Sequence, residues 1–330
     1  MPYAHITGIG SSVPKRVLSN ADLEKIVDTS DDWITRRTGI KERRIANCEA
    51  NESTADLATR SAQAAMKMAS ITSEQVDTII VATLTADRLF PATACMVQKE
   101  LHANNAAAYD ISAGCSGFLY GLEAANNSIR AGQSDTVLVI GSERLSSVVN
   151  WRDRSTCVLL GDGAGAVVLQ GRKEPGGILS THIKSDGRFW DLLYAKDGND
   201  YLPDMLQKTA TKPYSLAMAG NRLFRQAVGC MANIAEQALE RNGMQREEIN
   251  LVVPHQANLR IIRAVAEKLE IPMEKVFTNL HKYGNTSSGS IPLALDEAHY
   301  EGRIATGDNI LMVSFGAGLT WGSTILRWTL

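Results

Sequence analysis

Two kinds of hydrophobic pattern alternate along the chain. Residues 223–239 carry apolar side chains at spacings of three or four, which predicts one face of an amphipathic helix that stops at Asn242-Gly243. INLVV (249–253) is too short for a buried helix and rich in β-branched residues, so it predicts a buried parallel strand. A second helical face follows over 259–269. This alternation of helices and apolar strands predicts an α/β fold with a mostly parallel sheet and helices on its faces.

The chain also repeats itself at an offset of 172 or 173 residues. The segments 73–83, CSG (115–117) and TVLVIGSE (136–143) resemble 246–256, SSG (287–289) and NILMVSFG (309–316), in the same order. We interpret this as one α/β unit duplicated, with halves at 1–171 and 172–330. The small residues of 116–131 suit a helix squeezed between the two sheets of such a pair.

Composition excludes several classes of protein. The 330 residues are 44% hydrophobic and 21% charged, with a net charge of -2, which is typical of a folded globular protein and not of a nucleic-acid binder. No cationic stretch followed by an apolar one opens the chain, and apolar runs are far shorter than the roughly 20 residues of a membrane helix. Five cysteines without a CxxC pair indicate free thiols and a reducing, cytoplasmic location.

One of these cysteines has the sequence context of a nucleophile. Cys115 follows a short strand and a Ser-Ala-Gly turn, and a helix is expected to begin at or just after it. A helix N-terminus favours the thiolate, so we expect the pKa of Cys115 to be lowered. For Cys48, Cys95, Cys157 and Cys230 we expect inert, mostly buried thiols.

Two further residues are candidates for chemistry. His255 ends the strand INLVVP, and ligands bind beyond the carboxyl ends of strands in α/β sheets. Asn285 lies two residues before Ser287, the repeat mate of Cys115, so the pseudo-twofold axis is expected to bring its loop opposite the Cys115 loop. A nucleophilic thiol with two neutral donors favours acyl transfer and decarboxylation of a second thioester through an enolate. A Cys/His hydrolase, with Asn orienting the His, uses the same residues.

Other motifs predict less. GDGAGA (161–166) and GAGLTWG (316–322) lack the GxGxxG spacing, so we interpret both as glycine-rich hairpin turns. The six histidines form no pair with metal-ligand spacing, and no metal is expected. Arginines beside a tryptophan suit a nucleotide phosphate or an acidic partner; these residues are Trp33, Arg36, Arg37, Arg152, Arg154, Arg260 and Arg263.

Taken together, the motifs resemble β-ketoacyl-acyl carrier protein synthase III, the initiating condensing enzyme of the thiolase-like superfamily. The resemblance covers nearly the whole chain, through NADLEKIVDTSDDWITRRTGI, FPATAC, the Cys115 turn, GDGAGA, LAMAGN, VPHQANLRII, HKYGNTSS and FGAGLTWGS. It implies a five-layered αβαβα sandwich, a cytoplasmic homodimer, and no metal or other cofactor. It also implies decarboxylative condensation of a short acyl-CoA primer with malonyl-acyl carrier protein, which initiates fatty acid biosynthesis.

The resemblance assigns roles to residues of this sequence. Cys115 would accept the acyl group, His255 and Asn285 would assist condensation, and the backbone amides of Cys115 and Ala317 would form the oxyanion hole. The residues implied for coenzyme A are Trp33, Arg37, Arg154, Gly220 and Asn258. Those implied for the carrier protein are Gln256, Ala257, Asn258, Leu259 and Arg260. Those implied for the acyl pocket are Phe224, Phe315 and, reaching the partner subunit's pocket, Phe90.

The chain departs from the family pattern at three places. Glu267 stands where a basic residue is common, which would weaken carrier docking unless Arg263 compensates. Gly289 replaces a more usual Ala, and the variable segment 189–214 borders the expected acyl tunnel. The main alternative is a ketide synthase of the same fold that uses longer or aromatic acyl-CoA. A degradative thiolase, which needs a second cysteine near the C-terminus, and a non-catalytic partner subunit fit the sequence less well.

Overall fold

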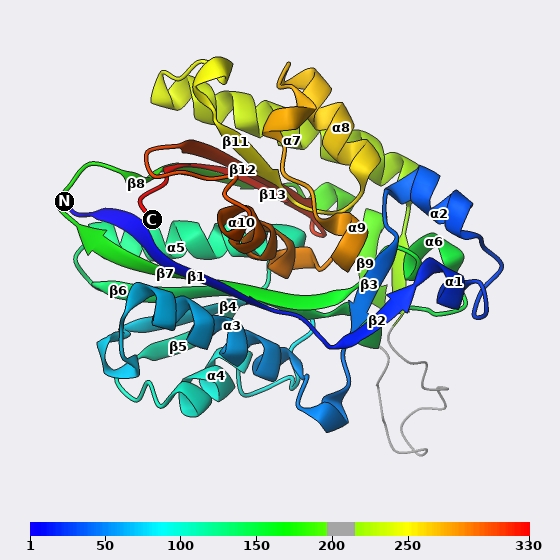
Figure 1. Ribbon diagram of the computed structural model, residues 1–330, viewed down its shortest axis with the longest axis horizontal. Helices are drawn as coiled ribbons and strands as arrows, with labels where there is room; N and C mark the ends of the chain where they lie inside the picture. The colour runs from blue at the N-terminus through cyan, green and yellow to red at the C-terminus, as the bar shows by residue number, and fades with distance from the viewer. Residues whose placement is uncertain (197–214) are drawn as a thin grey trace.

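The computed structural model describes residues 1–196 and 215–330, and they form five layers (Figure 1). Two sheets lie one above the other, with two helices between them and further helices on their outer faces. The first sheet has the order β1 (Tyr3–Ser12), β7 (Asp162–Arg172), β6 (Thr136–Arg144), β4 (Thr78–Ala82), β5 (Ala107–Ile111). The second has the order β8 (Gly177–Ser185), β13 (Thr320–Arg327), β12 (Asn309–Gly316), β11 (Leu251–Pro254).

The two sheets share one pairing scheme. β4 pairs parallel with β5 and β6, while β7 pairs antiparallel with β6 and β1. In the second sheet β11 pairs parallel with β12, and β13 pairs antiparallel with β12 and β8. An isolated parallel bridge between Val252 and Val276 stands where β5 stands in the first sheet. The duplicated α/β architecture is thereby confirmed, and the exact boundary between 171 and 172 stays a prediction. The expected mostly parallel sheet is wrong, because three of these pairings are parallel and four are antiparallel.

Helices fill the other three layers. The outer ones on the first sheet are α3 (Thr54–Ala69) and α4 (Thr93–Leu101), and those on the second are α7 (Gly220–Asn242) and α8 (Leu259–Lys268). The middle layer holds α5 (Gly117–Arg130) and α10 (Ser290–Tyr300). α7 ends as expected, because Gly243 takes the left-handed conformation at its C-terminus.

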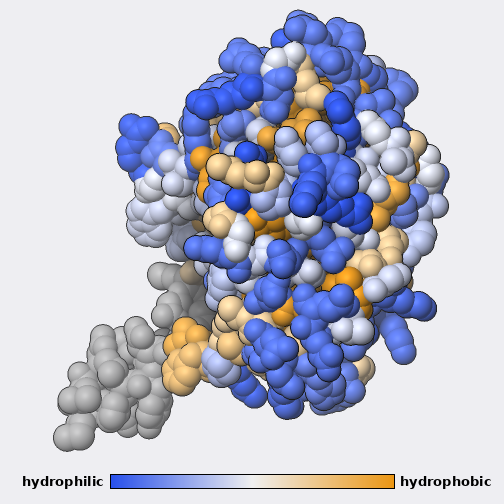
Figure 2. Space-filling model, turned by 90° about the vertical axis from the view of Figure 1, so that its left-hand side faces the viewer, coloured by the Kyte–Doolittle hydropathy of each residue, from blue (hydrophilic) through white to orange (hydrophobic). Residues whose placement is uncertain are grey.

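The remaining α-helices and strands gather at one end of the sandwich. They are β2 (Arg16–Ser19), α1 (Asn20–Leu23), α2 (Asp31–Thr38), β3 (Glu42–Ile45), α6 (Arg154–Cys157), β9 (Leu193–Lys196), β10 (Ser215–Met218) and α9 (Leu280–Tyr283). The opposite end is mostly hydrophilic, with scattered apolar patches (Figure 2). Within the described residues, no helix is both long and apolar enough to cross a membrane.

One glycine-rich motif was misassigned from sequence. GAGLTWG does form the turn between β12 and β13, but GDGAGA opens the long strand β7. The prediction of a hairpin turn there was wrong, because these glycines allow the strand to pack closely against α10. A Cβ at Gly165 would lie 2.7 Å from the backbone nitrogen of Leu293 in α10.

Gly141 of β6 should tolerate no larger side chain. A Cβ there would lie 2.2 Å from the carbonyl oxygen of Ser288, so backbone must shift. We expect Gly141→Ala to lower the free energy of unfolding by about 1–3 kcal/mol in urea titrations. Gly229 in α7 has open space around its Cβ position, so the control Gly229→Ala should raise it by about 0.5–1 kcal/mol. Equal changes in the free energy of unfolding for the two substitutions would contradict the close packing at Gly141.

Candidate active site

Cys115 lies in a single 3-10 turn, Gly114–Ser116, between β5 and α5. The turn is pressed against the end of β12 from the other half of the chain. Ser314 donates a hydrogen bond to the Cys115 carbonyl at 2.8 Å. A Cβ at Gly316 would lie 2.3 Å from the Cys115 nitrogen, and one at Gly114 would lie 2.7 Å from the Ala317 nitrogen. Two glycines therefore allow the backbone amides of Cys115 and Ala317 to come close together.

The expected low pKa of Cys115 is wrong. The residue is only 9% exposed, and loss of hydration raises the pKa of its thiol to about 12. The nearby Ser287 side chain acts in the opposite direction, while the Glu143 carboxylate adds to the rise. The helix α5 begins two residues later, at Gly117, so its N-terminus does not outweigh burial. The resting side chain is a neutral thiol.

His255 follows β11 directly and is fixed at two points. Its backbone N–H donates to Val313 at 2.8 Å, and its Nδ1 is 2.7 Å from the Ser290 hydroxyl. Burial lowers the pKa of His255 to about 3, so the imidazole is neutral at physiological pH. With Ser290 on Nδ1, Nε2 is the ring nitrogen that remains for a ligand.

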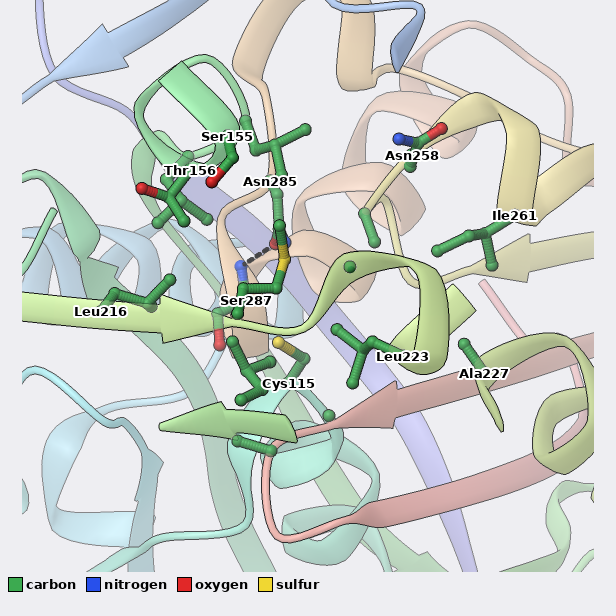
Figure 3. Close-up of a pocket in the computed structure, with 18 of the residues that line it drawn as sticks. Cys115, Ser155, Thr156, Leu216, Leu223, Ala227, Asn258, Ile261, Asn285 and Ser287 are labelled. Carbon is green, nitrogen blue, oxygen red and sulfur yellow. Dashed lines mark hydrogen bonds between the residues drawn. The ribbon is translucent and has the colours of Figure 1, made fainter. Parts of the chain in front are cut away.

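Asn285 is held by the first half of the chain. Its N–H donates to Leu159 at 2.8 Å, and its carbonyl accepts from the Gly161 N–H at 3.0 Å. Its side-chain oxygen accepts from the Ser287 N–H at 2.8 Å (Figure 3). The amide nitrogen of the side chain is therefore the group left to donate to a ligand.

The three candidate residues meet in one cavity of about 540 Å³. Figure 3 shows Cys115 on one loop and Asn285 with Ser287 on another. Other residues expected from the sequence also line this cavity: Trp33, Arg37, Arg154, Gly220, Phe224, Ala257, Asn258, Arg260, Phe315 and Ala317. The structure thus brings these residues together, as expected from the sequence, and their individual roles stay predictions.

Aromatic and cationic side chains pair at the cavity. The guanidinium groups of Arg37 and Arg154 lie 5.2 and 5.0 Å from the ring centre of Trp33. Arg154 also donates to the Asp28 carbonyl at 2.9 Å. Such cation–π stacks present a flat surface with positive charge, which suits an adenine nucleotide.

Three predicted contacts lie elsewhere. Leu259 is partly buried against the core beside α7 and α8 and does not line the cavity. Gln256 is buried, and its side chain bonds the backbone of Pro254, Phe277 and Asn279. It therefore shapes the loop from inside, and its assignment to carrier docking is corrected. Phe90 does not line this cavity and is 80% exposed. Of the variable segment 189–214, residues 197–214 lie outside the described residues, while Leu193, Tyr194 and Ala195 line the cavity.

Sequence reasoning missed three polar partners of the site. Ser290 holds the His255 ring, and Ser287 acts on the Cys115 thiol by lowering its pKa. Glu143 is fully buried and accepts bonds from Thr85 at 2.6 Å and from Ser288 at 3.0 Å. The serine-rich run SSGS beside Asn285 was the available signal for the first two. The sequence gave no signal for Glu143, since TVLVIGSE predicts only a strand.

Comparison with known proteins identifies close relatives. The family described as 3-oxoacyl-(acyl-carrier-protein) synthase III matches residues 109–187, and its C-terminal family matches residues 239–328. A β-ketoacyl-(acyl-carrier-protein) synthase III of Thioalkalivibrio sulfidiphilus is 49% identical over 99% of this chain and 100% of its own. The protein of that name from Aquifex aeolicus is 51% identical over 98% of this chain and 99% of its own.

Solved structures of similar proteins have the same fold as this chain. The crystal structure of 3-oxoacyl-(acyl-carrier-protein) synthase III from Aquifex aeolicus has a TM-score of 0.91 at 50% identity, covering 98% of this chain and 100% of that one. A priming β-ketosynthase of a polyketide pathway has a TM-score of 0.92 at 34% identity, covering 99% and 97%. Both carry the five-layered thiolase-like fold seen here. Among residues 1–196 and 215–330, no group of three potential metal ligands comes together.

The pKa of Cys115 sets its reactivity toward iodoacetamide. Because the thiol pKa is about 12, the thiolate fraction should rise about tenfold for each pH unit between 7 and 9. We expect the alkylation rate of the Cys115 peptide, followed by mass spectrometry, to rise in proportion. A plateau in this rate below pH 8 would show a low-pKa thiol and contradict the burial argument.

Proposed function

This chain belongs to the 3-oxoacyl-(acyl-carrier-protein) synthase III family, and we propose that it condenses a short acyl-CoA primer with malonyl-acyl carrier protein. The product is a 3-oxoacyl-acyl carrier protein, the first condensation product of fatty acid biosynthesis. The observation that carries the proposal is the meeting of Cys115, His255 and Asn285 in one cavity. The relatives near 50% identity carry the synthase III name, which favours this activity over a ketide synthase of longer or aromatic primers.

The first half-reaction transfers the acyl group to Cys115. Its sulfur forms a bond to the thioester carbonyl carbon, the carbon–sulfur bond of the acyl-CoA breaks, and the thiol proton leaves with coenzyme A. Negative charge develops on the carbonyl oxygen, where the backbone amides of Cys115 and Ala317 donate. Because the resting thiol is neutral, its proton must be lost during the attack, and it passes to the sulfur of the departing coenzyme A.

The second half-reaction makes the carbon–carbon bond. The malonyl carboxylate leaves as CO2, and its electron pair forms an enolate on the remaining thioester. Nε2–H of His255 and the side-chain amide of Asn285 donate to the enolate oxygen. The enolate carbon attacks the acyl carbon, and the Cys115 thiolate leaves and takes a proton from water. Neutral donors suit this step, since neither residue has to lose a proton.

The cavity wall suggests how the substrates bind. Trp33 with Arg37 and Arg154 stacks and pairs with the adenine nucleotide of coenzyme A, and Gly220 and Asn258 contact its pantetheine. This chemistry uses no metal or further cofactor. A cytoplasmic enzyme meets both substrates.

The carrier protein docks at the start of α8. Ala257, Asn258, Leu259 and Arg260 form this segment, and Arg260 lies 5.7 Å from the Phe224 ring. Carrier proteins are acidic, so exposed Arg260 and Arg263 attract them, while exposed Glu267 on the same helix opposes them.

The acyl group rests near Phe224 and Phe315. The working form is a homodimer, in which Phe90 from the partner completes this pocket. Exposed Leu89 and Phe90 and the partly exposed edge strand β5 support such an interface, since large apolar side chains and free strand edges are costly in water.

The proposal requires the sulfur of Cys115. Cys115→Ser should remove the acyl-enzyme, because an alcohol is a much weaker nucleophile than a thiol in this neutral site. Incubation with radiolabelled acetyl-CoA should label the wild type and leave the variant unlabelled. Cys157→Ser, a buried cysteine outside the cavity, serves as the control and should keep the label. Label retained on Cys115→Ser would refute the assignment.

His255 and Asn285 act in the second half-reaction. We expect His255→Ala and Asn285→Ala to keep formation of the acyl-enzyme and to lower malonyl decarboxylation by about 10²–10³-fold, as for loss of an oxyanion donor. Acylation is read by intact-protein mass spectrometry and decarboxylation by release of CO2. Equal loss of both half-reactions in Asn285→Ala would overturn its role.

A further inference from the structure

A charged side chain is buried behind the active site without an acidic hydrogen-bond partner. Arg43 on β3 is 0% exposed, and none of the ion pairs of the described residues includes it. Burial lowers the pKa of Arg43 to about 10, which leaves it protonated at neutral pH. A buried charge is costly unless hydrogen bonds compensate for the lost water, so the position calls for an explanation.

The guanidinium of Arg43 joins three segments. Nη1 donates to the Leu18 carbonyl at 3.2 Å and to the Asn20 side-chain oxygen at 2.9 Å. Nη2 donates to the Val158 carbonyl at 2.9 Å. The planar fork thus ties β2 and the start of α1 to the turn that follows α6. All three acceptors are neutral.

The turn that Arg43 holds is hydrogen-bonded to the loop that carries Asn285. Leu159, next to Val158, accepts the Asn285 N–H at 2.8 Å, and Gly161 donates to the Asn285 carbonyl at 3.0 Å. The stem of Arg43 also touches this ladder. A Cβ at Gly161 would lie 3.1 Å from the Arg43 Cβ, and one at Gly284 would lie 3.3 Å from it.

A second link runs from β3 to the same loop. The backbone N–H of Lys41, just before β3, donates to the carbonyl of His281 in α9 at 3.1 Å. Figure 1 shows α9 close to β3. α9 ends at Tyr283, two residues before Asn285, so the loop is braced on both sides by the segment that carries Arg43.

We propose that Arg43 is a positioning residue for Asn285: its guanidinium holds the 158–161 turn, and that turn sets where the Asn285 amide points in the cavity. The inference rests on the proposed function, since it gives Arg43 a part in the half-reaction assigned to Asn285. Cys115 sits on the far loop, beside Ser314, Ser287 and Glu143, and none of these is bonded to Arg43. The effect should therefore fall on decarboxylation and spare acylation.

The test compares the two half-reactions in Arg43→Met, Arg43→Lys, Asn285→Ala and the double variant Arg43→Met/Asn285→Ala. Acyl-enzyme formation is followed with acetyl-CoA, and decarboxylation with malonyl-acyl carrier protein. Arg43→Met should acylate within about threefold of wild type and decarboxylate at least about tenfold more slowly. Arg43→Lys keeps the positive charge but loses the planar guanidinium, so its decarboxylation rate should lie between those of the wild type and Arg43→Met. In the double variant decarboxylation should be no slower than in Asn285→Ala, because residues that act as a unit are not additive.

A matched arginine serves as the control. Arg60 on α3 also donates to a backbone carbonyl, that of Asn51, but it is exposed and away from the cavity. Arg60→Met should leave both half-reactions unchanged. Should Arg43→Met fail to fold, Arg43→Lys and Asn20→Ser take its place. Asn20→Ser removes one acceptor of the Arg43 guanidinium. Both variants should slow decarboxylation and spare acylation.

The outcomes separate two failures. Equal loss of both half-reactions in the Arg43 variants, or a double variant whose losses multiply, would overturn the positioning role and leave the proposed function standing. Decarboxylation at the wild-type rate in Asn285→Ala would instead remove the role of Asn285, and with it the basis of the inference. Wild-type decarboxylation in Arg43→Met alone would also refute the inference.

Discussion

The site depends on close backbone contact between the two halves of the duplicated chain. The Cys115 turn lies against the end of β12, and β6 lies against the turn before α10, at distances that leave no room for a Cβ at Gly316 or Gly141. Burying these polar turns is possible because their groups bond across the halves, as Ser314 does to the Cys115 carbonyl. Cys115 and Asn285 are thereby held by contacts from the opposite half, while His255 is held within its own half by Val313 and Ser290. The three proposed catalytic residues come from both halves, so each half alone lacks part of the site.

The same burial sets the electrostatics of the site. Loss of hydration raises the pKa of Cys115 and lowers that of His255, so both rest in their neutral forms. A neutral site accommodates an apolar acyl chain and concentrates its stabilisation on charge that develops during reaction. The arginines lie away from the thiol: Arg37 and Arg154 stack on Trp33 at the cavity wall, and Arg43 lies behind the Asn285 loop. Glu143 is the charged residue that is buried near Cys115.

Sequence patterns predicted most of the architecture, and for physical reasons. The repeat at an offset of 172 or 173 residues predicted both sheets, because homologous strands take equivalent places in each half. The same repeat placed Asn285 opposite Cys115. Local patterns failed where tertiary packing decides: GDGAGA is a strand because its glycines pack against α10, and Gln256 points inward. The prediction of a lowered pKa for Cys115 was wrong because the start of a helix can be read from the neighbouring sequence, whereas burial depends on the whole fold.

A crystal structure of the acetylated enzyme with a malonyl thioester analogue that cannot lose CO2 would test the central claim most directly. The account predicts that the thioester oxygen of the analogue lies about 2.7–3.2 Å from both Nε2 of His255 and the side-chain nitrogen of Asn285. It also predicts that the acetyl oxygen faces the amides of Cys115 and Ala317. An analogue bound with its thioester oxygen beyond hydrogen-bond distance of both side chains, or an acetyl group on another residue, would contradict it.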